Sequence, residues 1–393
     1  MATPLTEMKR LIVQAVDRHA VLWKELALKI HAHPEIGLAE EKASQWLCEA
    51  LAKAGFAVER GVADLPTAFV ASHGEIEARP AVAFLAEYDA LPELGHACSH
   101  NLICTAACLA ATALAETIGP EQARVCVIGC PAEESYGGKA QLVAHGIFKG
   151  IDIALMAHGY RMHLPARPAS GRKSLIFEFY GKSAHAAAAP HKGINALDAM
   201  IQTFVGISLL RQQLRGDDRV HGIITHGGKA PNIIPDYTRA EFMVRAMDIG
   251  RLNELEQRVL ACARGAAEAT GAQLKVSSGG LDMLPIRHNR TLEGLYADNL
   301  RFLGEELGTV PADQGAGSTD FGNVSQVVPA AHGYFQITTT AQAHTPEFAE
   351  VARSEAGLAG MVTAAKALAL TALDSIEDPA LLEKARSEFQ AVG

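Results

Sequence analysis

The chain has 393 residues, of which 49% are hydrophobic and 20% charged, an ordinary composition for a globular protein. This length is too great for one compact core and predicts two or more domains. The formal net charge of −9 argues against a nucleic-acid backbone as partner. No apolar run approaches the roughly 18 residues of a membrane span, so we expect no membrane association.

The seven cysteines are scattered along the chain and odd in number, so they imply no disulfide framework. The N-terminal segment also lacks the apolar run of a secretory signal. Together these two features predict a reducing, cytoplasmic location.

The N-terminal part of the chain alternates helical patterns with short apolar runs that are typical of buried strands. Helices are predicted at 5–31, 40–54 and 101–117, and strands at 81–85, 124–129 and 151–157. This alternation indicates an α/β fold with a mostly parallel sheet. In such sheets the functional residues usually lie in the loops that follow the strands.

The pattern changes near residue 172, where runs typical of half-exposed strands begin. The predicted order is a strand at 173–180, a helix at 194–214, strands at 220–226 and 237–246, a helix at 250–270 and a strand at 272–278. This β-α-β-β-α-β order is that of a ferredoxin-like insert. From about 286 the chain is predicted to be mostly helical. We therefore expect one domain made of 1–171 and 285–393, with a second domain at 172–284 inserted between its two parts.

The most informative motif is a cysteine and a histidine one residue apart, Cys98 and His100, followed further along by two adjacent carboxylates, Glu133 and Glu134. A thiolate and an imidazole at this spacing can bind one soft or borderline divalent metal. Of two adjacent carboxylates, one can bind a metal while the other acts as a general base. This combination suits hydrolysis by a metal-activated water, because the metal lowers the pKa of the water and a carboxylate takes its proton.

Two more histidines complete five candidate ligands with Cys98, His100 and Glu134. His158 ends a predicted strand, and His344 precedes a proline-containing loop. Any one of these residues alone would more often be structural, but together they offer nitrogen, oxygen and sulfur donors for two metal ions. Glu133 is then the natural general base.

Two further side chains lie close to the Cys–His motif. His96 could be another ligand, although a supporting or core role is favoured. Asp89 could accept a hydrogen bond from a ligand histidine and so fix its tautomer. The alternative for Asp89 is a turn-forming residue before a Leu-Pro pair.

The predicted insert contributes three candidates. His185 is flanked by small residues that leave its imidazole approachable, and Asn232 and Arg245 frame a predicted hairpin. An arginine can bind a carboxylate through two parallel hydrogen bonds. Each of the three, taken alone, could equally be a surface residue.

Motifs along nearly the whole chain resemble, in family order, the zinc-dependent aminoacylase/carboxypeptidase family of metallopeptidases. They are HPEIGLAE at 33–40, EYDALPELGHACSHN at 87–101, PAEE at 131–134, SAHAAAAPHKGINALDA at 183–199, APNIIPD at 230–236, GSTDF at 317–321 and HTPEF at 344–348. More narrowly, the chain is similar to the amidohydrolase branch. This branch includes N-acyl-amino-acid amidohydrolases, indole-acetyl-amino-acid hydrolases, p-aminobenzoyl-glutamate hydrolase and β-alanyl-lysine dipeptidase.

The resemblance implies a role for each candidate residue. The family's metal ligands fall on Cys98, His100, Glu134, His158 and His344, its general base on Glu133, and its substrate-contacting positions on Asn232 and Arg245, the arginine typically on a carboxylate. His185 falls on a histidine that reaches the site of the partner subunit and polarises the scissile carbonyl. The implied fold is a catalytic α/β domain with a ferredoxin-like lid that also dimerises. The implied cofactors are two divalent ions, zinc or manganese.

Two positions depart from the family pattern. Ser99 stands where the family usually has glycine, which adds local strain if that backbone needs a positive φ and would alter how the second metal is held. Asn101 replaces an aspartate that is common in bacterial aminoacylases. That asparagine resembles the p-aminobenzoyl-glutamate and β-alanyl-lysine sub-branch.

The sequence therefore predicts a homodimeric, metal-dependent amidohydrolase that cleaves the amide bond of an N-acyl amino acid or dipeptide-like substrate with a free carboxylate. The alternative within this class is an aryl-amide hydrolase acting on p-aminobenzoyl-glutamate-like substrates. One alternative of another class is a non-catalytic metal-binding protein, whose sign would be the loss of Glu133 or of a ligand. Another is a thiol redox sensor that uses Cys98.

Overall fold

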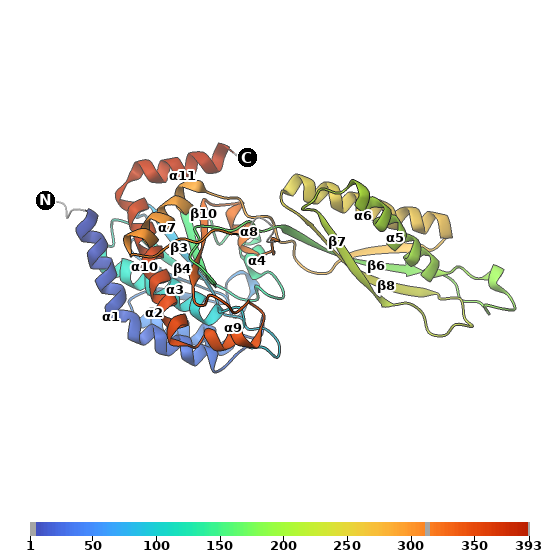
Figure 1. The fold of residues 1–393 in the computed structure, drawn as a ribbon, viewed down its shortest axis with the longest axis horizontal. Helices are drawn as coiled ribbons and strands as arrows, with labels where there is room; N and C mark the ends of the chain where they lie inside the picture. The colour runs from blue at the N-terminus through green and yellow to red at the C-terminus, as the bar shows by residue number, and fades with distance from the viewer. Residues whose placement is uncertain (1–4, 311–314, 392–393) are drawn as a thin grey trace. The chain divides into compact units, whose positions relative to one another are not determined.

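The computed structural model describes residues 5–310 and 315–391, and the chain divides into two compact units (Figure 1). The first, called here the α/β unit, comprises Met1–Arg167, Arg287–Gly315 and Asn323–Gly393. The second, called the insert unit, comprises Pro168–Ile286 and Ala316–Gly322. Each unit has its own cluster of buried apolar side chains, so each is organised around its own core.

The α/β unit is built on a six-stranded sheet. In spatial order its strands are β1 (Ala57–Arg60), β2 (Phe69–His73), β4 (Arg124–Cys130), β3 (Ala81–Glu87), β5 (Ile153–Tyr160) and β10 (Ala330–Gln336). β4, β3, β5 and β10 run parallel, and β2 and β1 add an antiparallel edge. The predicted α/β class with a mostly parallel sheet is confirmed.

The helices of this unit come from both ends of the chain (Figure 1). They are α1 (Leu5–His31), α2 (Glu41–Lys53), α3 (His100–Thr117), α4 (Gly138–Ala144), α7 (Arg290–Phe302), α9 (Pro346–Val351), α10 (Glu355–Glu377) and α11 (Pro379–Ala391), with a 3-10 turn at Val62–Asp64. The short helix α8 (Phe321–Ser325) joins the insert unit to the α/β unit along the chain.

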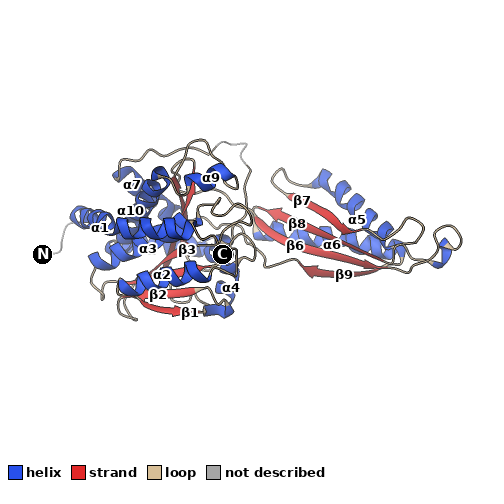
Figure 2. Cartoon of the chain, turned by 90° about the horizontal axis from the view of Figure 1, so that it is seen from below, coloured by secondary structure: helices blue, strands red, loops and turns tan. Residues whose placement is uncertain are grey.

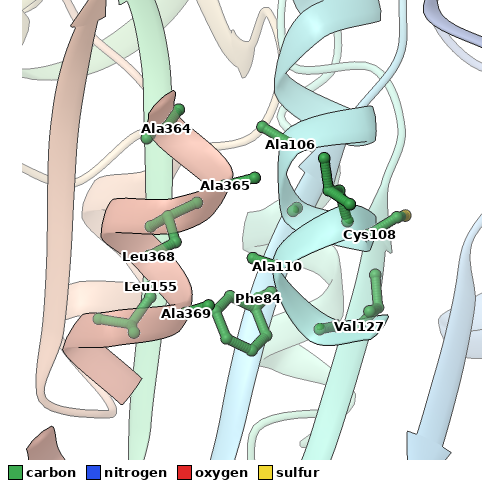
Figure 3. Packing of buried hydrophobic residues seen from close by; sticks show 14 of the residues in the cluster. Phe84, Ala106, Cys108, Ala110, Val127, Leu155, Ala364, Ala365, Leu368 and Ala369 are labelled. Atoms are coloured by element: carbon green, nitrogen blue, oxygen red, sulfur yellow. The ribbon is translucent and has the colours of Figure 1, made fainter. Parts of the chain in front are cut away.

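α3 and α10 form the centre of the α/β core. In Figure 3, Ala106 and Ala110 of α3 face Ala365 and Ala369 of α10, and all four are fully buried. Side chains this small let the two helices pack closely against each other and against the sheet. The expectation that no apolar run approaches the length of a membrane span is wrong at α10, which is long and apolar enough to cross a membrane. However, 78% of its most apolar stretch is buried, so it packs as a core helix.

The insert unit is a four-stranded antiparallel sheet with two helices on one face (Figure 2). Its elements are β6 (Gly171–Tyr180), α5 (Ala196–Leu210), β7 (Arg219–His226), β8 (Tyr237–Ala246), α6 (Ile249–Thr270) and β9 (Gln273–Ser278), with 3-10 turns at Pro190–Lys192 and Arg211–Gln213. The sheet order is β7-β8-β6-β9. The predicted β-α-β-β-α-β order and the ferredoxin-like insert are confirmed.

Burial alternates along the strands of the insert unit, as expected for a sheet that is covered on one face. On β8, Phe242 and Val244 pack into the core, whereas Glu241, Met243 and Arg245 lie on the open face. The open face therefore presents the charged side chains of Glu241 and Arg245, with Met243 between them, away from the two helices.

The prediction of a mostly helical chain from about 286 onward is wrong at β10. This strand pairs in parallel with β5 through its whole length and is buried along nearly all of it. Its short apolar run is interrupted by His332 and Gly333, so the sequence shows no clear strand pattern there. Its place at the edge of the parallel sheet depends on tertiary contacts with β5.

Candidate metal centre and active site

The candidate ligands lie in loops at one edge of the parallel sheet. Asp89 follows β3, Glu133 and Glu134 follow β4, and His158 lies near the end of β5. Because parallel strands end at the same edge, these side chains converge although they are far apart in the sequence. The two other donor positions lie beside them, Cys98 and His100 at the start of α3 and His344 just before α9.

The turn between Cys98 and His100 has the backbone conformation that favours glycine. Ser99 stands at the N-cap position of α3, where its φ is +63°, in the left-handed region. Its hydroxyl donates to the carbonyl of Cys98 at 2.5 Å. A Cβ at Gly159 would lie only 2.3 Å from this hydroxyl, so Ser99 fits because position 159 has no side chain. The condition for local strain at Ser99, a positive φ, is therefore met.

The five donor side chains form one cluster. Cys98 Sγ lies 3.4 Å from His158 Nε2, and His344 Nε2 lies 3.4 Å from Glu134 Oε1. His100 Nε2 is 3.9 Å from the same Glu134 oxygen. Three overlapping groups each bring their donor atoms within 4.8 Å of one another: Cys98, His100 and His158; Cys98, Glu134 and His344; and His100, Glu133 and Glu134.

Hydrogen bonds orient His100 and His158 so that both present Nε2 to the cluster. Asp89 Oδ1 accepts a hydrogen bond from His100 Nδ1 at 2.9 Å, and its Oδ2 accepts one from the backbone N–H of Glu134 at 3.0 Å. His158 Nδ1 donates to the carbonyl of Gly159 at 2.8 Å. Asp89 thus makes the contact that a tautomer-fixing residue must make, and it also ties the β3 loop to the β4 loop.

Burial and neighbouring charges set the protonation states of the cluster. Burial would lower the pKa of His100, but the Asp89 carboxylate raises it well above its ordinary value. Burial would raise the pKa of Glu134, but His344 and His100 lower it to about 2. Burial lowers the pKa of His158 to about 3, and the charge of His100 adds to this effect. Glu134 is therefore ionised and His158 neutral near pH 7, the forms that bind a cation, whereas His100 is protonated and would release its proton when a cation binds.

The donor atoms fit divalent cations. His100 Nε2 and Glu134 Oε1 are buried, and within the described residues neither has a hydrogen-bond partner. Leaving such atoms unsatisfied is costly, and a cation bound between them would satisfy both. Burial raises the pKa of the Cys98 thiol and the Glu134 charge adds to the rise, whereas a bound cation favours the thiolate. This mixture of sulfur, nitrogen and oxygen donors is typical of zinc sites.

His96 lies outside this cluster. It is buried, and this burial lowers its pKa to about 3. Its ring contacts the ring of His31 in a tilted arrangement, with the two centroids 5.8 Å apart. Among the described residues it belongs to none of the donor groups. The supporting or core role that the sequence favoured agrees with this position.

One buried ion pair beside the cluster was not predicted from the sequence. Lys139 is fully buried and its Nζ pairs with Glu87, while the other oxygen of Glu87 lies 3.5 Å from His100 Nε2. Glu87 begins the EYDALP motif, but no local signal marks Lys139. A lysine is rarely buried without a charged partner, and only the fold reveals that the two residues meet.

The three candidates of the insert unit do not lie together. The backbones of His185 and Asn232 lie side by side. The N–H of Ala186 donates to the Asn232 carbonyl at 3.0 Å, and His185 forms an isolated antiparallel β-bridge with Ile233. Arg245 lies near the far end of β8, where its guanidinium donates to Ser318 Oγ at 2.7 Å. Arg245 lies eight positions beyond Tyr237, the first residue of β8, a span of about 26 Å at the usual strand rise.

The fold and the donor cluster define the class of a metal-dependent hydrolase. Residues 169–270 match the family model described as a peptidase dimerisation domain. The chain is 41% identical to the Xaa-Arg dipeptidase of Mus musculus over 405 residues, which cover 99% of this chain and 94% of that relative. It is 29% identical to a p-aminobenzoyl-glutamate hydrolase chain of Escherichia coli (strain K12) over 469 residues, which cover 99% and 96% of the two chains.

Solved structures share the fold over most of the chain. A dinuclear metal-binding peptidase of the M20 family from Bacillus subtilis superposes with a TM-score of 0.68 at 20% identity, covering 91% of this chain and 99% of the other. An aminobenzoyl-glutamate utilization protein from Klebsiella pneumoniae superposes with a TM-score of 0.70 at 18% identity, covering 92% and 97%. The chain belongs to the M20 metallopeptidases, the aminoacylase/amidohydrolase family that its motifs resemble. It is a metal-dependent amidohydrolase.

Proposed function

We propose that this amidohydrolase cleaves a dipeptide or an N-acyl amino acid that carries a free carboxylate, using two divalent metal ions bound by Cys98, His100, Glu134, His158 and His344. The observation that carries the proposal is the convergence of these five donors beside Glu133. The solved relative described as dinuclear supports two metal ions. The thiolate and imidazole donors favour zinc, with manganese as the alternative. Seven free thiols suit a reducing cytoplasm.

The residues around the donors supply the proton transfers. When bound, the metals would polarise the scissile carbonyl and lower the pKa of a water molecule. Glu133 takes the proton of that water and later gives it to the leaving amine. His185 donates a hydrogen bond to the carbonyl oxygen as negative charge develops there. Asp89 keeps His100 in the tautomer that presents Nε2.

The relatives support two kinds of substrate. Identity to the Xaa-Arg dipeptidase is the higher, which favours a dipeptide. The match to p-aminobenzoyl-glutamate hydrolase extends over 99% of the chain and makes an aryl amide of glutamate the second candidate. Turnover of dipeptides, N-acyl amino acids and p-aminobenzoyl-glutamate, each measured with Zn²⁺ and with Mn²⁺, distinguishes the two. Failure to hydrolyse any of these amides would refute the proposal.

A row of arginines supports a carboxylate in the substrate. Arg172 on β6 and Arg219 on β7 each pair directly with Arg245 on β8, so the three lie side by side across the open face. Burial lowers the pKa of Arg245, and the charge of Arg172 adds to this effect. Like charges directly opposite each other on a sheet are destabilising, and a bound anionic group would relieve that repulsion.

Replacing Arg245 with alanine should lower kcat/KM by roughly 10²-fold or more on a carboxylate substrate, because losing one partner of a buried charge pair costs about 2–5 kcal/mol. The loss should be much smaller on the matching amide or ester, which carries no negative charge. Arg245→Lys should recover only part of the activity, because an ammonium cannot reproduce the two parallel hydrogen bonds.

The matched control for Arg245 is Arg239→Ala. Arg239 lies on the same face of β8 but pairs with Glu241, so its loss should affect both substrates little. Equal losses on charged and neutral substrates for Arg245→Ala would show that this arginine is structural.

Two observations support a homodimer. On α5, Ile201, Val205 and Leu209 form one exposed stripe at four-residue spacing, and Leu209 is 71% exposed. On the edge strand β7, Ile223 is also exposed, at 64%. Exposed apolar stripes beside an open sheet edge are typical of interfaces. The long separation of Asn232 from Arg245 also suits a site in which these two residues come from different subunits.

Two inactive variants, Glu133→Gln and His185→Ala, should therefore regain activity when they are mixed. If His185 acts in the partner's site, each mixed dimer holds one site with both residues intact. The measurement is turnover after subunit exchange, with dimer formation verified by light scattering. His191→Ala, an exposed histidine of the same segment, is the control that should keep its activity. A mixture that exchanges subunits and stays inactive would show that His185 does not act across the interface.

A further inference from the structure

The HPEIGLAE segment at 33–40 supplies none of the candidate ligands, yet it packs directly against the PAEE loop at 131–134. Gly37 approaches this loop so closely that a Cβ there would lie 2.9 Å from Cα of Ala132 and 2.3 Å from Oγ of Ser135. No side chain fits in that space without moving the loop. The contact therefore requires glycine at position 37.

Glu40, the last residue of this segment, is a fully buried carboxylate. Its Oε1 accepts a hydrogen bond from the backbone N–H of Ala132 at 2.8 Å, and its Oε2 accepts one from the Thr67 hydroxyl at 2.9 Å. Thr67 is held in turn, because its carbonyl accepts a hydrogen bond from the buried Tyr88 hydroxyl at 2.7 Å. The Glu40 carboxylate is thus fixed at both oxygens, and one of them holds the PAEE loop.

Glu40 has no capping role that would explain its burial. It stands at the N-cap of α2, but its side chain makes no capping hydrogen bond. The carboxylate of Glu35 performs that task instead, accepting hydrogen bonds from the N–H groups of Lys42 and Ala43 at 3.0 Å. Glu40 is therefore available to reach the loop that carries Glu133.

Ala132 has an unusual backbone conformation. Its φ is +58°, in the left-handed region that a residue with a Cβ rarely adopts. Such a conformation persists only where the surroundings impose it. The surroundings hold the Ala132 peptide groups on both sides. The N–H of Ala132 donates to Glu40, and the carbonyl of Ala132 accepts hydrogen bonds from the N–H groups of Tyr136 and Gly137. The next residue along the chain is Glu133, so this backbone turn sets the direction of the Glu133 side chain.

We propose that Glu40 is a positioning residue for Glu133, whose carboxylate holds the Ala132 peptide in the left-handed conformation that directs Glu133 toward the metal centre. Glu40 itself does not touch the substrate. The inference rests on the proposed function only in taking Glu133 as the general base.

The hydrogen bonds of Glu40 favour its ionised form, whereas its burial opposes it. Both of its side-chain partners are donors, and a charged acceptor makes the stronger hydrogen bonds. Burial raises the pKa of Glu40 to about 7, and the charge of Asp89 adds to the rise, whereas the hydrogen bonds from Thr67 and Ala132 lower it. A buried carboxylate is costly unless it is hydrogen-bonded, and both oxygens of Glu40 accept hydrogen bonds.

Glu40→Ala should lower kcat by roughly 10–100-fold with KM nearly unchanged, the range typical of residues that orient groups at metal sites. Glu40→Gln keeps an oxygen that can accept from Ala132 and should recover part of the loss. Gly37→Ala leaves Glu40 intact but pushes the loop, so it should lower kcat in the same way. The kinetics, metal content and melting temperature of each variant are measured together. A variant that fails to fold is recognised by its melting temperature, and the kinetics of the two folded variants then test the inference.

The matched control is Glu388→Ala. Glu388 also accepts hydrogen bonds from a backbone N–H and from a threonine hydroxyl. Both donors belong to Thr291, and both distances are 3.0 Å. Thr291 lies at the start of α7, a helix that carries none of the candidate site residues. Its loss should lower the melting temperature without lowering kcat. A loss of kcat in this control comparable to that in Glu40→Ala would assign both effects to stability and overturn the inference.

The decisive test places Glu40→Ala in the Glu133→Gln background. A positioning residue has nothing left to position there, so the second substitution should lower the residual turnover by less than about 3-fold. A further loss as large as that in the wild-type background would overturn the inference, and so would a Glu40→Ala enzyme with normal kcat. Failure of the proposed function is recognised separately, because Glu133→Gln alone would then turn over normally.

Discussion

Replacing Glu133 with glutamine should lower kcat by about 10²–10⁴, the usual contribution of a general base, and leave the metal content of the protein unchanged. Glutamine preserves the volume and hydrogen-bonding length of the side chain but cannot take a proton. Glu134 sits beside it as the candidate ligand, 3.4 Å from His344 and 3.9 Å from His100. The measurement is steady-state turnover on the preferred amide together with metal analysis of the same preparation.

The neighbouring variant Glu134→Gln separates the two carboxylates. It should lose both turnover and bound metal, because Glu134 faces two candidate ligand histidines and its ionised form is the one that binds a cation. If Glu133→Gln loses metal while Glu134→Gln keeps it, the two roles are exchanged. If Glu133→Gln turns over at a near-normal rate, another group takes the proton from water.

The convergence of the candidate site could be predicted because it follows from sheet geometry and donor chemistry. Buried strands were expected at 81–85, 124–129 and 151–157, and each lies within a strand of the parallel sheet or overlaps it. Loops after parallel strands meet at one edge, so the residues that follow them had to lie close together. Side chains with metal-binding chemistry in those loops then pointed to a single centre.

The residues that support this centre could not be predicted, because their effect depends on contacts between distant segments. Lys139 meets Glu87 only through the fold, and Glu40 meets Ala132 across 92 positions in the sequence. A glutamate just before a helix ordinarily indicates a capping or solvent-exposed residue. The left-handed φ of Ala132 likewise leaves no sign in its residue type, since alanine seldom adopts it.

The position of Arg245 also depended on tertiary structure. The hairpin that contains Asn232 and Arg245 was expected from strand patterns, and β7 and β8 do form it. Both residues were expected to contact substrate, but β8 extends for ten residues and carries Arg245 away from the connecting loop that holds Asn232. The alignment of Arg172 with Arg245 follows from the register of β6 and β8, which cannot be read from either strand alone.

Removing metal ions with a chelator should abolish amidase activity and lower the melting temperature. Without a cation, His100 Nε2 and Glu134 Oε1 stay buried with no hydrogen-bond partner among the described residues. A metal ion that binds only the folded state stabilises it by about 2.7 kcal/mol when its free concentration is 100 times the Kd. The measurement compares turnover and thermal unfolding of the chelated and the reloaded protein.

Adding Zn²⁺, Mn²⁺ or Co²⁺ should restore both quantities in the wild-type protein, and His344→Ala should weaken the restoration. His344 is half-exposed, and the Glu134 carboxylate beside it raises its pKa, so it is the ligand whose removal disturbs the core least. The control is His145→Ala, which removes an exposed histidine paired with Asp64 and should respond to metal as the wild type does. Full activity in rigorously metal-free protein would show that the cluster does not supply the chemistry, whereas activity that returns with one metal alone would identify the ion that these donors prefer.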